Sequence, residues 1–218
     1  PPYNIGVDYG KYYNDSQDWE EYYNLINRFL KEAFRVLKSN GRMIINLPEN
    51  KREPIHHKLV NMALKNGFNY LINIIWYKKG VSGRTAWGSW KSCSAPMVIP
   101  PFEYITVFYK GDYKKEGEQT DLTKKEFIEW TYGWWDFGSD KEGNNHPATF
   151  PRELPRRCIK LFSYVGDVVL DPFAGSGTTL LEAKSLNRKY IGFEINPRFV
   201  EMANKRLQQT QLNGGANF

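Results

Sequence analysis

The sequence predicts an α/β fold in which helices cover both faces of a doubly wound, mostly parallel sheet. Short apolar runs alternate with segments of helical periodicity toward both ends of the chain, which is the pattern of such sheets. A glycine-rich turn over 171–179 lies between a predicted strand and a predicted helix, and a segment rich in Gly, Ser, Trp and Pro over 78–101 separates the two halves. A length of 218 residues fits one such domain with a sizeable insertion.

The first half of the chain is predicted to supply two helices and three strands. Between Gln17 and Lys38 the apolar residues recur at helical spacing, and Asn40-Gly41 is a stop signal for a helix. Pro54 is a favourable first residue for a second helix, which would end at Asn66-Gly67. The apolar or β-rich runs predicted as strands are 43–47, 68–77 and 103–109.

The second half is predicted to be mainly helical, with two short strands. Thr123 and Glu126 form a capping-box pattern for a short helix over 121–131, and no periodicity is visible from Gly133 to Asn145. The remaining elements, in chain order, are a helix over 151–162, a strand over 168–170, a helix over 177–186, a strand over 190–193 and a helix over 197–207.

The composition favours a folded protein with a polyanionic partner. Hydrophobic residues make up 41% of the chain, which is enough for a packed core, and the formal net charge of +6 favours nucleic acid without requiring it. Cys93 and Cys158 fit neither a metal-ligand spacing nor a disulfide framework, and His56-His57 lacks a third ligand, so no metal site is predicted. No apolar run is long enough to cross a bilayer, and a cytoplasmic setting is expected.

The turn over 171–179 is a candidate ligand site. Glycines in it let the backbone approach a ligand without a Cβ, and Asp171 at the strand end can pair with an ammonium group. Asp171 would repel a phosphate, and the Gly-Lys-Ser/Thr of a P-loop is absent. An ordinary glycine turn fits the same residues. The candidate binding residues are Asp171, Phe173, Ala174, Gly175, Ser176, Gly177 and Thr178.

Glu194 follows the next predicted strand, about twenty residues beyond the glycine turn, where dinucleotide-type folds place an acid that binds ribose. A carboxylate there can accept both ribose hydroxyls. The competing interpretation is that Glu194 caps the helix that opens at Pro197. A ligand with a cationic amino-acid end and a ribose would satisfy Asp171 and Glu194 together, and S-adenosylmethionine has both.

Two motifs give the chain a resemblance to a known family. The segment Asp171–Thr179 resembles the AdoMet-binding motif of amino-directed DNA methyltransferases, and Pro1-Pro2-Tyr3 resembles the last three residues of their (Asp/Ser/Asn)-Pro-Pro-Tyr catalytic motif. The catalytic motif comes first, with a long insertion before the AdoMet motif, which is the order of the β group. The segment His146–Pro151 resembles the one that precedes the AdoMet strand, which adds Thr149 and Phe150 to the candidate cofactor-binding residues. The resemblance implies the Rossmann-like fold of AdoMet-dependent methyltransferases.

The resemblance assigns catalysis to Pro1, Pro2 and Tyr3, and implies that the chain lacks its N-terminal segment, because the first motif residue is not in the sequence. The amino nitrogen of a base is a poor nucleophile, since its lone pair is delocalised into the ring. Acceptors around it, here the carbonyl of Pro1, favour a localised lone pair. Tyr3 would stack on a base flipped out of the duplex. Neither cysteine follows a proline, so the nucleophilic Pro-Cys of carbon-5 cytosine enzymes is absent.

The middle of the chain is interpreted as a target-recognition region. The predicted division is a catalytic half over 1–77, an insertion over 78–145 that includes the strand 103–109, a cofactor-binding half over 146–210 and a flexible tail over 211–218. Basic side chains would contact phosphates and a few side chains would reach base edges. The residues selected are Lys78, Lys79, Arg84, Ser89 and Lys91. A solvated loop whose tryptophans cap the core fits the same residues. The cluster 130–136 is predicted to pack as a satellite of the core, and Asp8 and Asp15 to be ordinary surface acids.

The expected function is transfer of a methyl group from S-adenosylmethionine to the exocyclic amino group of a flipped base in double-stranded DNA. The segments 87–90 and 4–6 resemble enzymes whose motif begins with Ser, which favours N4 of cytosine over N6 of adenine. An RNA or protein methyltransferase and a non-catalytic DNA-binding module are alternatives. A nicotinamide-dependent enzyme is disfavoured, because Asp171 would repel a pyrophosphate. A cognate restriction endonuclease is a candidate partner, and a prokaryotic, DNA-associated monomer or weak dimer is expected.

Overall fold

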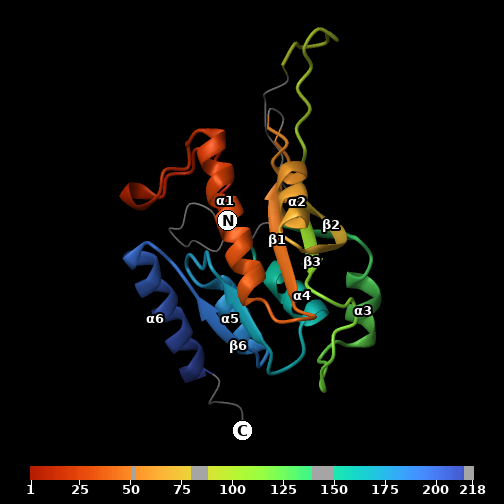
Figure 1. The fold of residues 1–218 in the computed structure, drawn as a ribbon, viewed down its shortest axis with the longest axis vertical. Helices are drawn as coiled ribbons and strands as arrows, with labels where there is room; N and C mark the ends of the chain where they lie inside the picture. Colours follow the sequence, from red (N-terminus) through yellow and green to blue (C-terminus); the bar gives the residue numbers. More distant parts are fainter. Residues whose placement is uncertain (51–52, 80–87, 139–149, 214–218) are drawn as a thin grey trace. The chain divides into compact units, whose positions relative to one another are not determined.

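The computed structural model describes residues 1–50, 53–79, 88–138 and 150–213 (Figure 1). The chain forms two compact units. One comprises residues 1–22, 115–131 and 140–218, and the other comprises 23–114 and 132–139. Each unit therefore combines segments that are far apart in the sequence.

A four-stranded mixed sheet forms the centre of the unit made of 23–114 and 132–139. Its strands are β1 (Arg42–Pro48), β2 (Asn69–Lys79), β3 (Phe102–Tyr109) and β4 (Trp134–Gly138), in the order β1-β3-β2-β4. β3 is antiparallel to β1 and β2, and β4 is parallel to β2. Three strands of this sheet therefore run in one direction, and β3, which the predicted insertion includes, lies reversed between two of them.

The helices of this unit follow the predicted periodicity. α1 (Trp19–Val36) begins in the other unit, where the Asp18 carboxylate accepts a hydrogen bond from the N–H of Glu20 (2.8 Å). Beyond its end Asn40 has a φ of +63°, as the predicted stop signal requires. α2 (Ile55–Lys65) contacts β1 and β2 and buries Ile55 and Leu59. The predicted strands 43–47, 68–77 and 103–109 are confirmed as β1, β2 and β3.

β4 is a strand that the sequence did not predict, since no periodicity is visible over 133–145. Five residues are too few to reveal alternation, and the partner strand β2 is distant in the chain. Trp135 is fully buried, and the indole N–H of Trp76 donates to the carbonyl of Phe137 (3.0 Å). Trp135, predicted to pack in a satellite cluster, thus lies within the sheet, whereas Trp134 remains half exposed.

The other unit contains two parallel strands, β5 (Val168–Asp171) and β6 (Lys189–Gly192), connected through α5 (Thr178–Ser185). α6 (Pro197–Asn213) packs against α5, and Figure 1 shows both blue helices beside these strands. Leu180 and Leu181 of α5 form a buried cluster with Leu207 of α6. The predicted order of strand, helix, strand and helix in this region is confirmed.

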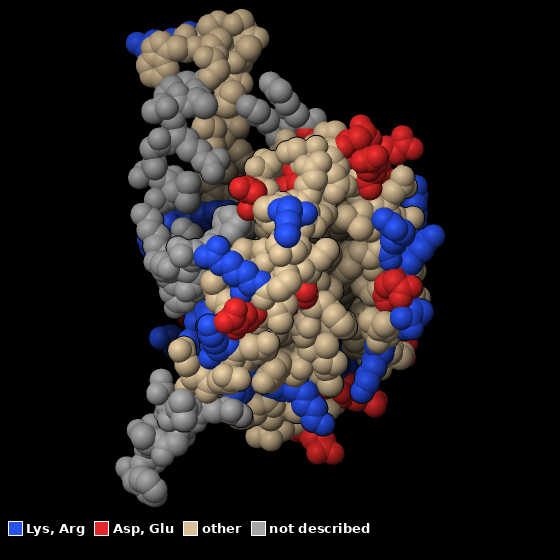
Figure 2. Space-filling model, turned by 90° about the vertical axis from the view of Figure 1, so that its left-hand side faces the viewer, with Lys and Arg blue, Asp and Glu red and all other residues tan. Residues whose placement is uncertain are grey.

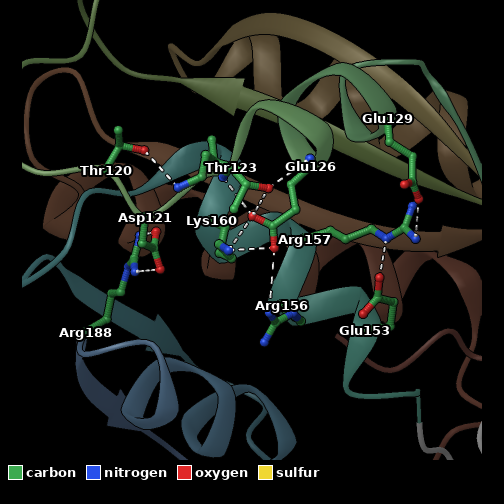
Figure 3. Close-up of polar contacts among 11 residues, drawn as sticks. Thr120, Asp121, Thr123, Glu126, Glu129, Glu153, Arg156, Arg157, Lys160 and Arg188 are labelled. Carbon is green, nitrogen blue, oxygen red and sulfur yellow. Dashed lines mark hydrogen bonds and ion pairs between the residues drawn. The ribbon is translucent and has the colours of Figure 1, made fainter.

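α3 (Lys124–Trp130) and α4 (Glu153–Phe162) belong to the same unit and are joined by ion pairs (Figure 3). Thr123 and Glu126 form the predicted capping box. The Nζ of Lys160 on α4 donates to both Glu126 oxygens at 2.6 Å. Arg188, whose side chain is fully buried, donates to the two oxygens of Asp121 at 2.7 and 2.8 Å. The segment 115–131 therefore packs on α4 and on the residue that precedes β6.

Candidate functional site

The glycine-rich turn joins the end of β5 to the start of α5. Asp171 ends β5, and its Oδ1 accepts a hydrogen bond from the N–H of Phe173 (3.0 Å). The N–H of Ala174 donates to a carbonyl just beyond β6 (2.9 Å). Gly175 and Gly177 have φ values of +50° and +82°, a region that favours glycine. The turn therefore lies at the C-terminal ends of both strands, where ligands bind in parallel α/β sheets.

Glu194 lies beyond β6 and connects that strand to the turn. One of its carboxylate oxygens accepts a hydrogen bond from the N–H of Gly175, and the other from the N–H of Asn196, both at 2.8 Å. The cap of α6 is Asn196, whose Oδ1 accepts from the N–H of Arg198 (3.0 Å), so Glu194 does not serve as that cap. Each Glu194 oxygen can accept a further hydrogen bond.

Residues of α6 contact and support the turn. Nη1 of Arg206 donates to the carbonyl of Ser176 (2.7 Å), to its hydroxyl (3.0 Å) and to the hydroxyl of Thr178 (3.3 Å). A Cβ on Gly177 would lie 2.9 Å from the Cβ of Ala203. Ser176 and Thr178, both predicted to bind the cofactor, are thus buried and hydrogen-bonded to α6.

The opening Pro1-Pro2-Tyr3 lies in the same unit as the turn. The negative charge of the Asp171 carboxylate acts on the Pro1 nitrogen. Pro1 is therefore within electrostatic range of Asp171, although the two residues come from opposite ends of the sequence. All three residues of the tripeptide are half-buried. The fold therefore brings the predicted catalytic motif into the same unit as the end of β5.

The loop after Tyr3 contains one residue, Tyr9, that the sequence did not indicate as part of a site. It includes the short 3-10 helix η1 (Gly10–Tyr12), and Gly6–Ser16 line a pocket of about 400 Å³. Burial raises the pKa of Tyr9 to about 12, with contributions from neighbouring groups that include the Glu194 carboxylate. Tyr9 is therefore within electrostatic range of Glu194. Nothing in the local pattern around Tyr9 connects it to a residue so far along the chain.

Asp15 is buried, so the prediction that it is an ordinary surface acid is wrong. Its side chain accepts hydrogen bonds from the backbone N–H groups of Asn4 (2.8 Å), Ile5 (3.1 Å) and Val7 (3.0 Å), and the residue is 2% exposed. Asn4 and Gly6 in this loop adopt positive φ. A carboxylate that binds several N–H groups stabilises such a loop, and the Asn and Gly positions were the available signal. Asp8 is exposed, as predicted.

Two residues predicted to contact DNA are engaged within the unit of 23–114 and 132–139. The Nζ of Lys78 forms an ion pair with Glu103 and lies 5.2 Å from the ring centroid of Trp76. The hydroxyl of Ser89 donates to the carbonyl of Ser92 (2.8 Å) and accepts from the N–H of Ala95 (2.8 Å). Both side chains are therefore already engaged in contacts within the protein.

Lys79 and Lys91 of the same prediction are exposed. The Lys79 side chain is 70% exposed, with Asp136 3.7 Å away, and Lys91 lies 5.7 Å from the ring centroid of Trp90. On the face shown in Figure 2, basic and acidic side chains of the described residues are interspersed. The net charge is therefore not gathered into one basic patch on that face.

Two further predicted residues, Arg84 and Thr149, lie outside the described residues, and Phe150 is half-buried. In the part of the chain that the structure describes, no group of three potential metal ligands occurs. No helix among the described residues is long and apolar enough to span a membrane.

The β5–α5–β6 unit, its glycine turn and the acids at both strand ends define an α/β protein of the methyltransferase type. The chain belongs to the DNA methylase family, whose model matches residues 1–205. The predicted family is thereby confirmed, and the chain is a DNA methyltransferase.

Relatives and a solved structure agree with this assignment. The chain is 44% identical over 147 residues to the type II methyltransferase M.MjaVI of Methanocaldococcus jannaschii, covering 65% of this chain and 75% of that protein. It is 31% identical over 228 residues to the DNA adenine methyltransferase YhdJ of Escherichia coli, covering 95% and 74%. A protein of Thermus thermophilus described as a DNA modification methylase, solved with S-adenosyl-L-methionine, matches with a TM-score of 0.71 at 30% identity, covering 88% of this chain and 78% of that one. This match confirms the predicted methyltransferase fold.

Proposed function

We propose that this chain transfers the methyl group of S-adenosylmethionine to the exocyclic amino group of a flipped base in double-stranded DNA, with N4 of cytosine as the target. The observation that carries the proposal is that one compact unit contains both the Pro-Pro-Tyr tripeptide and the glycine-rich turn, with Pro1 within electrostatic range of Asp171. Membership of the DNA methylase family supports it. An amino-directed methyltransferase gains much of its rate by holding donor and acceptor together.

The residues at the turn fit S-adenosylmethionine, which supplies an electrophilic methyl group. The Asp171 carboxylate is half-buried at the end of β5 and suits the ammonium of the amino-acid part. The Glu194 carboxylate is fixed by two backbone N–H groups and retains acceptor capacity for ribose hydroxyls. Ser176 and Thr178 are engaged by Arg206, so in this proposal they support the turn rather than hold the cofactor. The solved relative with S-adenosyl-L-methionine supports this choice of cofactor.

The tripeptide supplies the acceptors that an amino nitrogen needs. The carbonyl of Pro1 accepts a hydrogen bond from the amino group and so favours a localised lone pair on nitrogen. Proline has no N–H that could compete at this position. The ring of Tyr3 stacks on the flipped base. Cys158, which precedes the glycine-rich turn in the sequence, is 7% exposed, and burial raises its pKa to about 12, so it does not act as a nucleophilic thiolate.

The choice of N4-cytosine rests on the resemblance of segments 4–6 and 87–90 to enzymes whose motif begins with Ser. The alternative is N6 of adenine, and it is favoured by the 31% identity to a relative named a DNA adenine methyltransferase. Both amino groups are reached by the same acceptor chemistry. The sequence does not include the first position of the (Asp/Ser/Asn)-Pro-Pro-Tyr motif, the position that by the resemblance would separate the two cases.

For DNA binding, the exposed Lys79 and Lys91 are the residues best placed among the described candidates to neutralise phosphates. Lys78 forms an ion pair with Glu103, and the Ser89 hydroxyl forms a hydrogen bond within its own loop. The type II names of several relatives support a setting in which methylation protects DNA from a cognate endonuclease.

The test is the identity of the methylated base. The full-length protein is incubated with duplex DNA and S-adenosylmethionine, and the DNA is digested to nucleosides for mass spectrometry. N4-methylcytosine is expected, and Tyr3→Ala is the control that should abolish it. N6-methyladenine alone would establish the alternative, and 5-methylcytosine alone would overturn the mechanism.

A further inference from the structure

A hydroxyl from α1 binds the middle of the catalytic tripeptide. The Tyr22 hydroxyl donates to the carbonyl of Pro2 at 2.9 Å, and Tyr22 has no exposed surface. Burial, with smaller contributions from Tyr13 and Asp15, raises the pKa of Tyr22 well above its usual range. The hydroxyl therefore keeps its proton and remains a donor.

Fixing the Pro2 carbonyl also limits the orientation of the neighbouring carbonyl of Pro1. The Pro2 carbonyl lies in the peptide plane between Pro2 and Tyr3, and the Pro1 carbonyl lies in the plane before it. The ring of Pro2 locks φ, which is one of the two torsions that relate these planes. Once Tyr22 holds the second plane, little freedom is left for the Pro1 carbonyl, the acceptor that the proposed reaction requires.

On the other side of Tyr3, the Asp15 carboxylate holds the chain. The N–H of Asn4 donates to Oδ1 of Asp15, and the N–H groups of Ile5 and Val7 donate to Oδ2. The backbone of Asn4 is left-handed, with a φ of +57°, which asparagine tolerates better than most residues. The backbone is therefore fixed immediately before and immediately after the Tyr3 side chain.

The Asn4 side chain connects this loop to the start of α1. Its amide donates to the carbonyl of Gln17 (2.9 Å) and accepts from the N–H of Gln17 (2.7 Å). Asn4 is 7% exposed, so these bonds are shielded from water. The loop is thus closed at its base, two residues before the helix that carries Tyr22.

We propose that Tyr22 and Asp15 are positioning residues for methyl transfer, which orient the Pro1 carbonyl and the Tyr3 ring without touching the base. The inference rests on the proposed function, because it assigns these residues to a tripeptide that acts on the base. It does not follow from any motif, since both residues lie beyond the Pro-Pro-Tyr and one of them is in a helix. Positioning errors act on the chemical step more than on cofactor binding.

The test compares Tyr22→Phe with Tyr13→Phe in the full-length protein. Tyr22→Phe removes the hydroxyl that donates to the Pro2 carbonyl and keeps the ring. Tyr13 is the matched control from the same loop, because its hydroxyl is a buried atom with no hydrogen-bond partner among the described residues. The measurements are kcat for methylation of duplex DNA, the Kd for S-adenosylhomocysteine and the melting temperature. Asp15→Asn, which keeps the shape of the side chain but loses an acceptor oxygen, is the second variant.

Tyr22→Phe should lower kcat about tenfold, with the Kd for S-adenosylhomocysteine unchanged, and Tyr13→Phe should leave kcat unchanged. Asp15→Asn should also lower kcat. If the wild type is active and Tyr22→Phe keeps its kcat, the inference is wrong while the proposed function stands. If Tyr22→Phe lowers the melting temperature and the affinity for S-adenosylhomocysteine together with kcat, Tyr22 has a merely structural role and the inference is wrong. A wild type that methylates no amino group would end the proposed function and this inference with it.

Discussion

The ion pair between Glu126 and Lys160 gives a prediction whose size can be worked out. Glu126→Gln keeps the capping box of α3, because glutamine serves in that position as glutamate does. It removes the charge and one acceptor oxygen. Lys160 is 6% exposed, and its two 2.6 Å hydrogen bonds go to the Glu126 carboxylate. The variant therefore leaves a buried ammonium group beside a neutral amide.

Two estimates of the stability that Glu126→Gln loses agree. Burial alone would raise the pKa of Glu126, but the bonds and charge of Lys160, with the bonds of Thr123, outweigh burial and lower it from 4.5 to about 2. A shift of that size is equivalent to about 3 kcal/mol of stability at neutral pH. Removing one partner of a buried ion pair costs about 3–5 kcal/mol. Because the Glu126 side chain is 18% exposed and water screens part of the interaction, we expect a loss of about 2–3 kcal/mol.

The sign of the pH dependence follows from the depressed folded-state pKa. The stabilisation is complete above the ordinary value of 4.5 and is lost as the pH falls toward about 2. The difference in unfolding free energy between the wild type and Glu126→Gln should therefore be full at about pH 7 and less than half as large at about pH 3. Urea unfolding followed by tryptophan fluorescence at several pH values measures it.

The control is the double variant Glu126→Gln with Lys160→Met. Because it leaves no unpaired buried charge, it should be less destabilised than the sum of the two single variants. A loss below about 1 kcal/mol at neutral pH, the size of an exposed ion pair, would refute the reasoning, as would a difference that does not change with pH.

Two further predictions concern the cofactor acid and the cysteines. Glu194→Gln should weaken binding of S-adenosylhomocysteine about tenfold in isothermal titration, because an amide cannot accept at both Gly175 and Asn196, and an unchanged affinity would remove Glu194 from the cofactor site. Iodoacetamide should label Cys93 and spare Cys158 in the native protein, since Cys93 is exposed and burial raises the pKa of Cys158 to about 12. Intact mass spectrometry of the protein labelled in buffer and in urea checks this. Equal labelling of both thiols in the native protein would contradict the prediction.

The predicted helices and strands were confirmed where the sequence pattern that indicates them lies within one short segment. The periodicity of α1, the stop at Asn40 and the capping box at Thr123 are local properties of the sequence. β4 was missed because its five residues gain their strand character from pairing with the distant β2. The burial of Asp15 was missed for a related reason, since the residues next to Asp15 do not show that its carboxylate will bind N–H groups of a loop that begins about ten residues earlier. Tertiary contacts decided both cases.

At the candidate site, too, the motifs were visible in the sequence, but the residues that hold their backbone in place were not. In the glycine turn and in the Pro-Pro-Tyr loop, backbone N–H and carbonyl groups form hydrogen bonds with polar side chains from other segments of the chain. Glu194 accepts from Gly175, and Arg206 donates to the carbonyl of Ser176. Tyr22 donates to the carbonyl of Pro2. A backbone that must present acceptors at fixed positions cannot be specified by its own side chains alone, so its supports lie outside the motif. Substitutions at such supports should therefore affect methyl transfer although no motif contains them.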